Sequence, residues 1–185
     1  MSLEHLWAGW RSEYIDRVTA GRTDAPEGGG CVMCRLVAAS PDDPDAHVVW
    51  QGPGVTAALN AFPYTSGHLM VMPERHVGNL EDLTPDETQR LWAAVTGAVV
   101  AVKAAYRPDG VNAGINLGHA AGAGIPGHLH VHVLPRWAAD TNFMTSVAEA
   151  RVLPEALGVS WQKLRSAWPT AAGGAGAPPG GGAGA

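Results

Sequence analysis

The chain has little positive charge and no long apolar run. Lys and Arg number 12 against 17 Asp and Glu, which leaves a formal net charge of -5. This balance excludes the basic face that a nucleic-acid polymer or an anionic membrane requires. No stretch approaches the roughly 20 apolar residues of a membrane-spanning helix, and the first residues lack the basic and apolar regions of a secretory signal. We therefore expect a cytoplasmic protein with no membrane partner, in which any anionic ligand needs locally placed donors.

Cysteine is also scarce. The chain has only two cysteines, Cys31 and Cys34, which stand three positions apart. In a reducing compartment such a pair favours metal binding or redox activity over a structural disulfide. The choice between these depends on partners elsewhere in the chain.

Length and composition favour one domain. The chain has 185 residues, 46% of them apolar, which suits a single α/β or α+β domain with a real core. We place this domain at residues 1–170. Residues 171–185 are only Ala, Gly and Pro, which cannot bury a core, so we predict a disordered tail there.

Hydrophobic periodicity predicts the order of helices and strands. Apolar residues recur at three- and four-residue steps over 3–18 and 84–107, as on one face of a helix. Thr84, Pro85 and Glu87 supply a cap, a first-turn proline and a capping box for the second of these. The predicted strands are 48–50, 55–59 and 69–72, arranged as antiparallel neighbours, then 111–117 and 128–134, and a last helix is expected around 155–167.

The strongest chemical signal is an alternation of histidine with apolar residues. His128, His130 and His132 share one face of the predicted strand at steps of about 6.5 to 7 Å, while the residues between them face the core. The alternative is a solvent-facing strand that carries histidines without function. The Gly-rich loop 118–124 lies just before the strand, where backbone N–H groups can approach an anion closely. Together, loop and strand predict a phosphate site beside a nucleophile.

Around these residues the chain resembles the histidine-triad superfamily, whose signature continues His-Val-Leu-Pro-Arg, as in residues 132–136. Segments 59–64, 67–73, 112–118 and 135–137 look like the bacterial branch that includes diadenosine tetraphosphate phosphorylases and hydrolases. The resemblance extends over most of residues 3–145. It implies an α+β fold, with an antiparallel sheet, the long helix on one face and helices near both ends, and it implies a homodimer.

The resemblance also implies the roles of two histidines. His130 would attack the α-phosphorus and form a nucleotidyl-histidine intermediate, which water or phosphate then resolves. An imidazole suits this role because it is largely neutral at cytoplasmic pH. His132 would donate to the phosphate or leaving-group oxygen as charge develops there. Orienting His130 is the alternative role for His132.

By the same resemblance, four residues would bind substrate. Asn60 matches a position that binds the ribose hydroxyls, Asn116 matches one that faces the phosphates, and Gly122 and Gly124 would contribute through their backbones. A turn role for Asn60 and a strand-to-loop hydrogen bond for Asn116 are the alternatives. Many relatives carry Gln, Ser or Thr at the position of Gly124, where the side chain assists the leaving group, so its absence indicates a different rate or leaving group.

A structural zinc ion is the implied cofactor. Zinc-bearing members of the superfamily use a Cys-x-x-Cys pair, a histidine after the proline that ends the third strand, and the first histidine of the triad. Here these are Cys31, Cys34, His76 and His128, which form a closed tetrahedral set. An ordinary unliganded Cys-x-x-Cys is the alternative. With His128 on the metal, catalysis falls to the other two triad histidines, and His68 is expected to play a supporting or structural part.

Three functions follow. The leading hypothesis is transfer or hydrolysis of the nucleotidyl group of a dinucleoside polyphosphate, diadenosine tetraphosphate above all. A nucleoside phosphoramidase or an adenylyl-sulfate-type transferase would use the same His130 intermediate with another leaving group. From a different class, the chain could be a zinc-stabilised nucleotide- or partner-binding module without turnover.

Overall fold

The computed structural model describes residues 30–138, 140 and 155–170, which hold one five-stranded antiparallel sheet. The strands are β1 (Val48–Gly52), β2 (Val55–Leu59), β3 (Leu69–Pro73), β4 (Gly110–Ile115) and β5 (Val131–Arg136). The helices are α2 (Val32–Ala38), α3 (Pro85–Tyr106) and α5 (Leu157–Ala167), with short 3-10 turns η1 (Leu80–Asp82) and η2 (His119–Ala121). The predicted helix 3–18 and tail 171–185 lie outside the described residues, so the predicted domain boundaries stay predictions.

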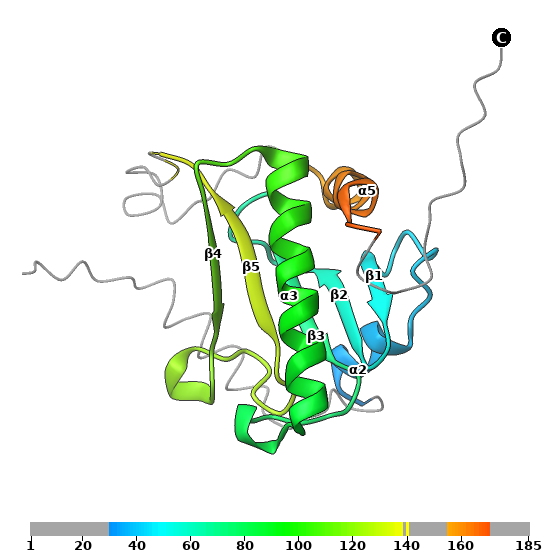
Figure 1. The fold of residues 1–185 in the computed structure, drawn as a ribbon, viewed down its shortest axis with the longest axis vertical. Helices are drawn as coiled ribbons and strands as arrows, with labels where there is room; N and C mark the ends of the chain where they lie inside the picture. Colours follow the sequence, from blue (N-terminus) through cyan, green and yellow to red (C-terminus); the bar gives the residue numbers. More distant parts are fainter. Residues whose placement is uncertain (1–29, 139, 141–154, 171–185) are drawn as a thin grey trace, which may run out of the picture.

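The strand order is β1-β2-β3-β5-β4, which puts β4 at one edge. Helix α3 crosses one face of the sheet, and α5 lies beside it (Figure 1). The main core fills the space between these helices and the sheet. Its fully buried members include Leu69, Val71, Leu91, Val102, Val131 and Val133. The predicted α+β class, with the long helix on one face, is confirmed.

A smaller core lies on the opposite face of the sheet. It consists of Met33 from α2 with Val48, Ala58, Met70 and Met72 from three strands. The register pairs Met70 of β3 with His132 of β5, and successive strand residues alternate between faces. The histidine face of β5 therefore continues the face that α2 covers, opposite α3.

Helix α3 begins and ends as its sequence predicts. The Thr84 hydroxyl accepts from the Glu87 N–H at 3.2 Å, and the Glu87 carboxylate accepts from the Thr84 N–H at 2.8 Å, so the capping box is present. Arg107 takes the left-handed conformation after the last turn, with φ of 45°. The predicted helix at 84–107 is confirmed to within one residue at each end.

Two local features differ from the predicted elements. Helix α2 was not predicted; it starts at Val32, and Met33, Leu36 and Val37 recur at helical spacing and pack on the smaller core. The last strand begins at Val131 and not at His128. Val71 pairs with Val131, and two residues further along β3 lies Pro73, which has no N–H to donate across to β5. The N–H of Leu129 instead donates to the carbonyl of Val77 at 2.6 Å.

The remaining strands and α5 match their predicted places within a few residues. Two tryptophans hold α5 against β1. The indole N–H of Trp161 donates to the Val48 carbonyl at 2.7 Å. Trp168, directly after α5, stacks on Trp50 of β1 with ring centroids 5.1 Å apart. In the part of the chain that the structure describes, no helix is both long and apolar enough to cross a membrane.

The capping box generates a stability prediction. Thr84→Ala removes the oxygen that accepts from Glu87, and we expect a loss of about 1 kcal/mol in the free energy of unfolding, measured by urea denaturation. Thr96→Ala is the matched control, because Thr96 is exposed in the same helix and its hydroxyl donates only to the Trp92 carbonyl one turn earlier. An equal loss in both variants would show that the cap contributes nothing specific.

Candidate functional site

The candidate site consists of two groups of side chains joined by residues 128–132. The metal cluster is Cys31, Cys34, His76 and His128. The histidine cluster is His68, His130 and His132. The His132 ring lies between the other two, with its centroid 4.9 Å from that of His130 and 5.1 Å from that of His68. All the histidines that the sequence pattern singled out thus belong to one continuous site.

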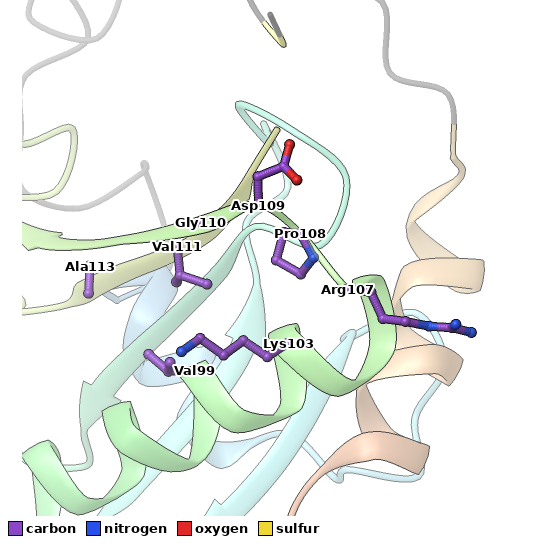
Figure 2. Close-up of a pocket in the computed structure, with 8 residues that line it drawn as sticks. All are labelled: Val99, Lys103, Arg107, Pro108, Asp109, Gly110, Val111 and Ala113. Atoms are coloured by element: carbon purple, nitrogen blue, oxygen red, sulfur yellow. The ribbon is translucent and has the colours of Figure 1, made fainter. Parts of the chain in front are cut away.

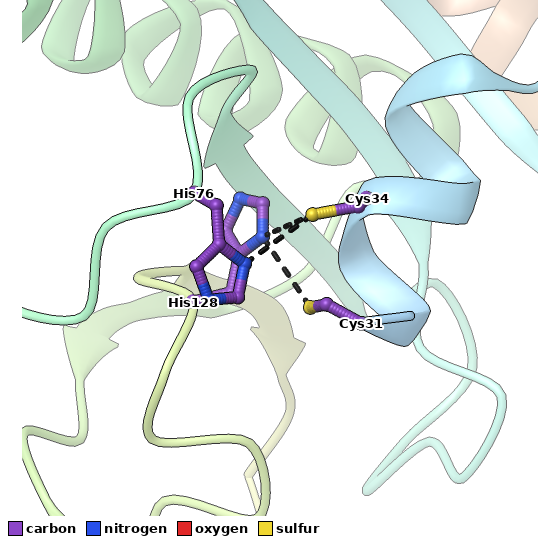
Figure 3. Close-up of side chains that lie close together, drawn as sticks. All are labelled: Cys31, Cys34, His76 and His128. Carbon is purple, nitrogen blue, oxygen red and sulfur yellow. Dashed lines mark hydrogen bonds between the residues drawn. The ribbon is translucent and has the colours of Figure 1, made fainter. Parts of the chain in front are cut away.

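The donor atoms of the metal cluster converge from three parts of the chain. The cysteines lie at the start of α2, His76 lies in the loop after β3, and His128 precedes β5 (Figure 3). The four ligand atoms all lie within 4.8 Å of one another. His128 Nδ1 is 3.5 Å from both sulfur atoms, and His76 Nδ1 is 3.3 Å from Cys34 Sγ.

These distances suit a tetrahedral zinc site. Zinc bonds of about 2.3 Å to sulfur and 2.0–2.1 Å to nitrogen imply sulfur-to-nitrogen edges of roughly 3.5 Å. Burial and the neighbouring Cys31 raise the pKa of the Cys34 thiol, which disfavours two thiolates side by side unless a cation offsets their charge. The donor set therefore fits a divalent soft-to-borderline metal better than a free dithiol.

The ring of His128 is held at both nitrogens. Its Nε2–H donates to the Pro73 carbonyl at 2.9 Å, so the neutral ring has its lone pair on Nδ1, directed at the cysteines. Metal-bound histidines commonly donate their other ring N–H to a carbonyl in this way. The side chain is fully buried, and burial lowers its pKa, which favours the neutral form that a ligand needs.

His130 presents the opposite pattern. Its Nδ1–H donates to the backbone carbonyl of His128 at 2.9 Å, so the lone pair of the neutral ring lies on Nε2. The residue is 6% exposed, and burial lowers its pKa. A neutral imidazole with a free Nε2 is the form in which histidine acts as a nucleophile.

A hydrogen-bond chain through His68 sets the tautomer of His132. The Tyr64 backbone N–H donates to His68 Nδ1 at 3.1 Å, so His68 carries its proton on Nε2. That proton is donated to His132 Nδ1 at 2.9 Å, which leaves His132 with its own proton on Nε2. Burial, with a smaller contribution from His130, lowers the pKa of His132 to about 4. His132 is therefore a neutral N–H donor beside the His130 ring.

Gly67 determines where His68 stands. Its φ is +79°, a conformation that favours glycine, and a Cβ at this position would lie 2.4 Å from the Tyr106 ring. The chain therefore packs tightly against the last residue of α3 just before β3 begins. This approach fixes the start of β3 and the place of the His68 ring.

The two asparagines predicted to bind substrate lie at different places relative to the histidine cluster. Asn60 is next to it, because Asn60 Nδ2 is 3.4 Å from His68 Nδ1, and its Oδ1 accepts from the Phe62 N–H in a local turn. Asn116 follows Ile115, whose partner in β5 is Val131, so Asn116 lies beside the start of that strand. The binding roles of Asn60 and Asn116 stay predictions.

The glycine loop is more compact than its sequence suggests. Gly122 has φ of +91°, and its N–H donates to the His119 carbonyl at 2.9 Å, while the Ala123 N–H donates to the Gly118 carbonyl. The N–H of Gly122 would have to leave His119 before it could bind an anion. Gly124 follows the buried Ala123 and brings no side chain to the site.

Sequence reasoning assigned no role to Tyr64 and only a general one to His68. The Tyr64 ring lies 4.7 Å from the His68 ring and 6.0 Å from the His132 ring, and it is 47% exposed. Tyr64 thus covers the outer side of the hydrogen-bond chain. The sequence did contain a signal for this role, because Tyr64 lies between Asn60 at the end of β2 and the pair Gly67-His68 before β3.

A separate hollow of about 540 Å³ lies between the end of α3 and β4 (Figure 2). Val99 and Lys103 of α3 line one side, and Val111 and Ala113 of β4 line the other. No histidine or cysteine of the described residues lines it. The hollow is therefore a feature of the β4 edge and not of the candidate site.

Comparisons with known proteins agree with this geometry. A family model described as the HIT domain matches residues 42–139. The AP-4-A phosphorylase of Mycobacterium tuberculosis is 38% identical over 166 residues, which are 90% of this chain and 85% of that protein. The asymmetrical bis(5'-nucleosyl)-tetraphosphatase of Schizosaccharomyces pombe is 38% identical over 84 residues, or 45% of this chain and 46% of that one. A zinc-bound histidine triad family protein from Mycobacterium smegmatis has a similar fold, with a TM-score of 0.56 and 29% identity over 74% of this chain and 91% of that one.

The lowered pKa of His132 predicts an acid-sensitive stability. In the unfolded chain histidine has its ordinary value of 6.5, whereas the folded value is about 4, so the unfolded state binds the proton first. The contribution of His132 to stability is complete above pH 6.5 and is lost as the pH falls toward 4. Ring NMR should show His132 still neutral at pH 5. His132→Asn should flatten the acid dependence of unfolding, and a titration of His132 near 6.5 would contradict the buried neutral donor.

Proposed function

Because the chain belongs to the HIT domain family, we propose that it is an enzyme that cleaves a nucleotidyl phosphate bond of dinucleoside polyphosphates, diadenosine tetraphosphate above all. One observation carries the proposal: the Nε2 lone pair of His130 lies next to a ring whose own Nε2 carries a proton. A nucleophile and a hydrogen-bond donor are thus prepared side by side. The names of the M. tuberculosis and S. pombe relatives supply the substrate class.

The reaction divides into two displacements. In the first, His130 Nε2 attacks the α-phosphorus, a P–N bond forms, and the P–O bond to the leaving nucleotide breaks. His132 donates its Nε2–H to the oxygen on which charge develops. In the second, water or inorganic phosphate attacks the same phosphorus and the P–N bond breaks, which restores the imidazole. Two displacements replace one difficult step with two easier ones.

Binding falls to the residues around the histidine cluster. We assign the ribose hydroxyls to Asn60, whose amide lies beside His68, and the phosphates to Asn116 and the backbones of Gly122 and Gly124. Phosphate binding by Gly122 would require its N–H to leave the His119 carbonyl. Since Gly124 offers no side chain to the leaving group, His132 alone would stabilise it. The missing side chain at Gly124 also favours a second candidate, a phosphoramidase or adenylyl-sulfate-type transferase acting through the same intermediate.

We assign a structural zinc ion to Cys31, Cys34, His76 and His128. The converging donors support this, as does the zinc-bound fold neighbour. The four ligands fill a tetrahedral site and leave no position for substrate, so the ion would stabilise the fold and take no part in bond breaking. Reduced thiols are required for this site, which supports a cytoplasmic location.

We propose a homodimer that pairs through the β4 edge. An edge strand presents backbone N–H and C=O groups that a second copy can pair with, and a twofold axis makes such an edge self-complementary. Beside it, α3 exposes Trp92 and Val100, which are 44% and 47% accessible. The hollow between Lys103 and Val111 adjoins this surface, so a partner would also find a recess there.

Turnover of diadenosine tetraphosphate tests the proposed enzyme directly. Products are followed by chromatography with and without inorganic phosphate. ADP formed only with phosphate identifies a phosphorylase, and no nucleotide product in either case refutes the substrate.

His130→Ala should lower turnover by at least about 1,000-fold while nucleotide binding survives. The control is His47→Asn, because His47 lies before β1 with φ of 52°, which Asn tolerates, and its turnover should be unchanged. Full function in His130→Ala would instead favour a binding module.

Metal analysis of the purified protein tests the zinc assignment. We expect zinc in an amount equal to the chain at neutral pH, and its loss in Cys31→Ser. Chelation should lower the melting temperature, because a ligand that binds only the folded state stabilises it. Protein purified at a pH where thiolates form, yet free of zinc, would remove this assignment.

A further inference from the structure

We propose that the metal cluster holds the peptide group that fixes the tautomer of His130, so that His76 and His128 act as positioning residues for the nucleophile. The role of His130 as the nucleophile comes from the proposed function. The contacts that support the inference are independent of that function. They concern one peptide plane, between His128 and Leu129.

Both polar groups of this peptide are engaged. Its carbonyl, on His128, accepts the Nδ1–H of the His130 ring at 2.9 Å. Its N–H, on Leu129, donates to the carbonyl of Val77 at 2.6 Å. The orientation of the carbonyl, and with it the acceptor that His130 needs, therefore depends on the bond between Leu129 and Val77.

Each end of that bond is next to a metal ligand. Val77 directly follows His76, and Leu129 directly follows His128, so the two ligand histidines flank the hydrogen bond in sequence. A metal bound by both histidines ties their chain segments together beside the bond. His128 is additionally held by its Nε2–H bond to Pro73, and it is fully buried, whereas His76 is exposed. Without the metal, only the buried ligand keeps its fixed position.

The tautomer follows from the peptide. While the His128 carbonyl accepts from Nδ1, the proton of neutral His130 stays on Nδ1 and the lone pair stays on Nε2. If the segment carrying His76 moves and Val77 releases Leu129, the peptide can rotate and nothing retains the proton on Nδ1. A proton on Nε2 occupies the lone pair that would attack phosphorus. Loss of metal should therefore inactivate His130 without unfolding the domain.

Gly78 shows how closely the two segments approach. A Cβ on Gly78 would lie 2.7 Å from the backbone carbonyl of Pro126, and a Cβ on Gly127 would lie 3.5 Å from His76 Nε2. The segment after β3 and the segment before β5 are thus in direct backbone contact around the metal cluster. A small shift in one is transmitted to the other, since packed backbone has no space in which to absorb it.

The test compares His130 in wild type, His76→Ala and His76→Asp. Because His76 is exposed, its replacement leaves the core intact, and Asp restores a zinc ligand. Ring ¹⁵N NMR reports which nitrogen of His130 carries the proton, zinc is measured on the same samples, and nucleotidyl adduct formation with diadenosine tetraphosphate is timed by mass spectrometry. We expect Nδ1–H in wild type, a mixture of tautomers in His76→Ala with adduct formation slower by about 10- to 100-fold, and recovery in His76→Asp supplied with zinc.

The control for lost stability is Val102→Ala, which opens the main core far from the metal cluster and should lower the melting temperature while His130 keeps Nδ1–H. A metal-free His76→Ala protein that is folded and still shows only Nδ1–H would overturn the inference, as would a wild type that binds no zinc. Failure of the proposed function looks different. In that case no adduct forms in any variant, while the tautomer still follows the metal.

Discussion

Pro73 stands where β3 and β5 part, and the hydrogen bond that its carbonyl accepts from the His128 ring organises the site around it. Proline has no N–H, so the ladder with β5 cannot continue past Val71 and Val131. The chain before β5 is therefore free to turn, and it pairs instead with the segment after β3 through Leu129 and Val77. One missing donor thus places His128, His130 and their connecting peptide at the same end of the sheet.

Burying so many imidazoles is costly unless each nitrogen has a partner. His68 and His128 are fully buried and His130 is 6% exposed, yet each ring makes directed bonds. Three of these bonds involve backbone groups at fixed positions: the Tyr64 N–H, the Pro73 carbonyl and the His128 carbonyl. Backbone groups cannot change protonation, so they determine which nitrogen of His68, His128 and His130 carries the proton, and His68 then determines the tautomer of His132. Neutral, directed imidazoles result from burial and from these anchors together.

The sequence predicted what depends on periodicity and local chemistry. The capping box of α3, the antiparallel strands and the apolar face of segment 128–134 all follow from residues close together in the chain. It did not predict α2, whose seven residues are too few for a clear pattern, nor the bond between His68 and His132, which joins residues 64 positions apart. Such long-range contacts depend on the register of β3 against β5, which no local pattern specifies. The metal cluster was expected only through the family resemblance.

Because the chain carries a net negative charge, a phosphate site in it needs donors that offset the repulsion of an anion. Four guanidinium groups of the described residues already pair with carboxylates: Arg75 with Glu87, Arg90 with Asp86, Arg136 with Asp140 and Arg165 with Asp42. The histidine cluster itself consists of neutral rings, so toward a polyphosphate it offers a neutral N–H donor and no charged group. Neutral donors attract phosphate weakly in water, but in a buried site their fixed dipoles act at low dielectric constant and need no reorganisation during the reaction. The burial that keeps His132 uncharged is therefore also what makes its Nε2–H group effective toward an anion.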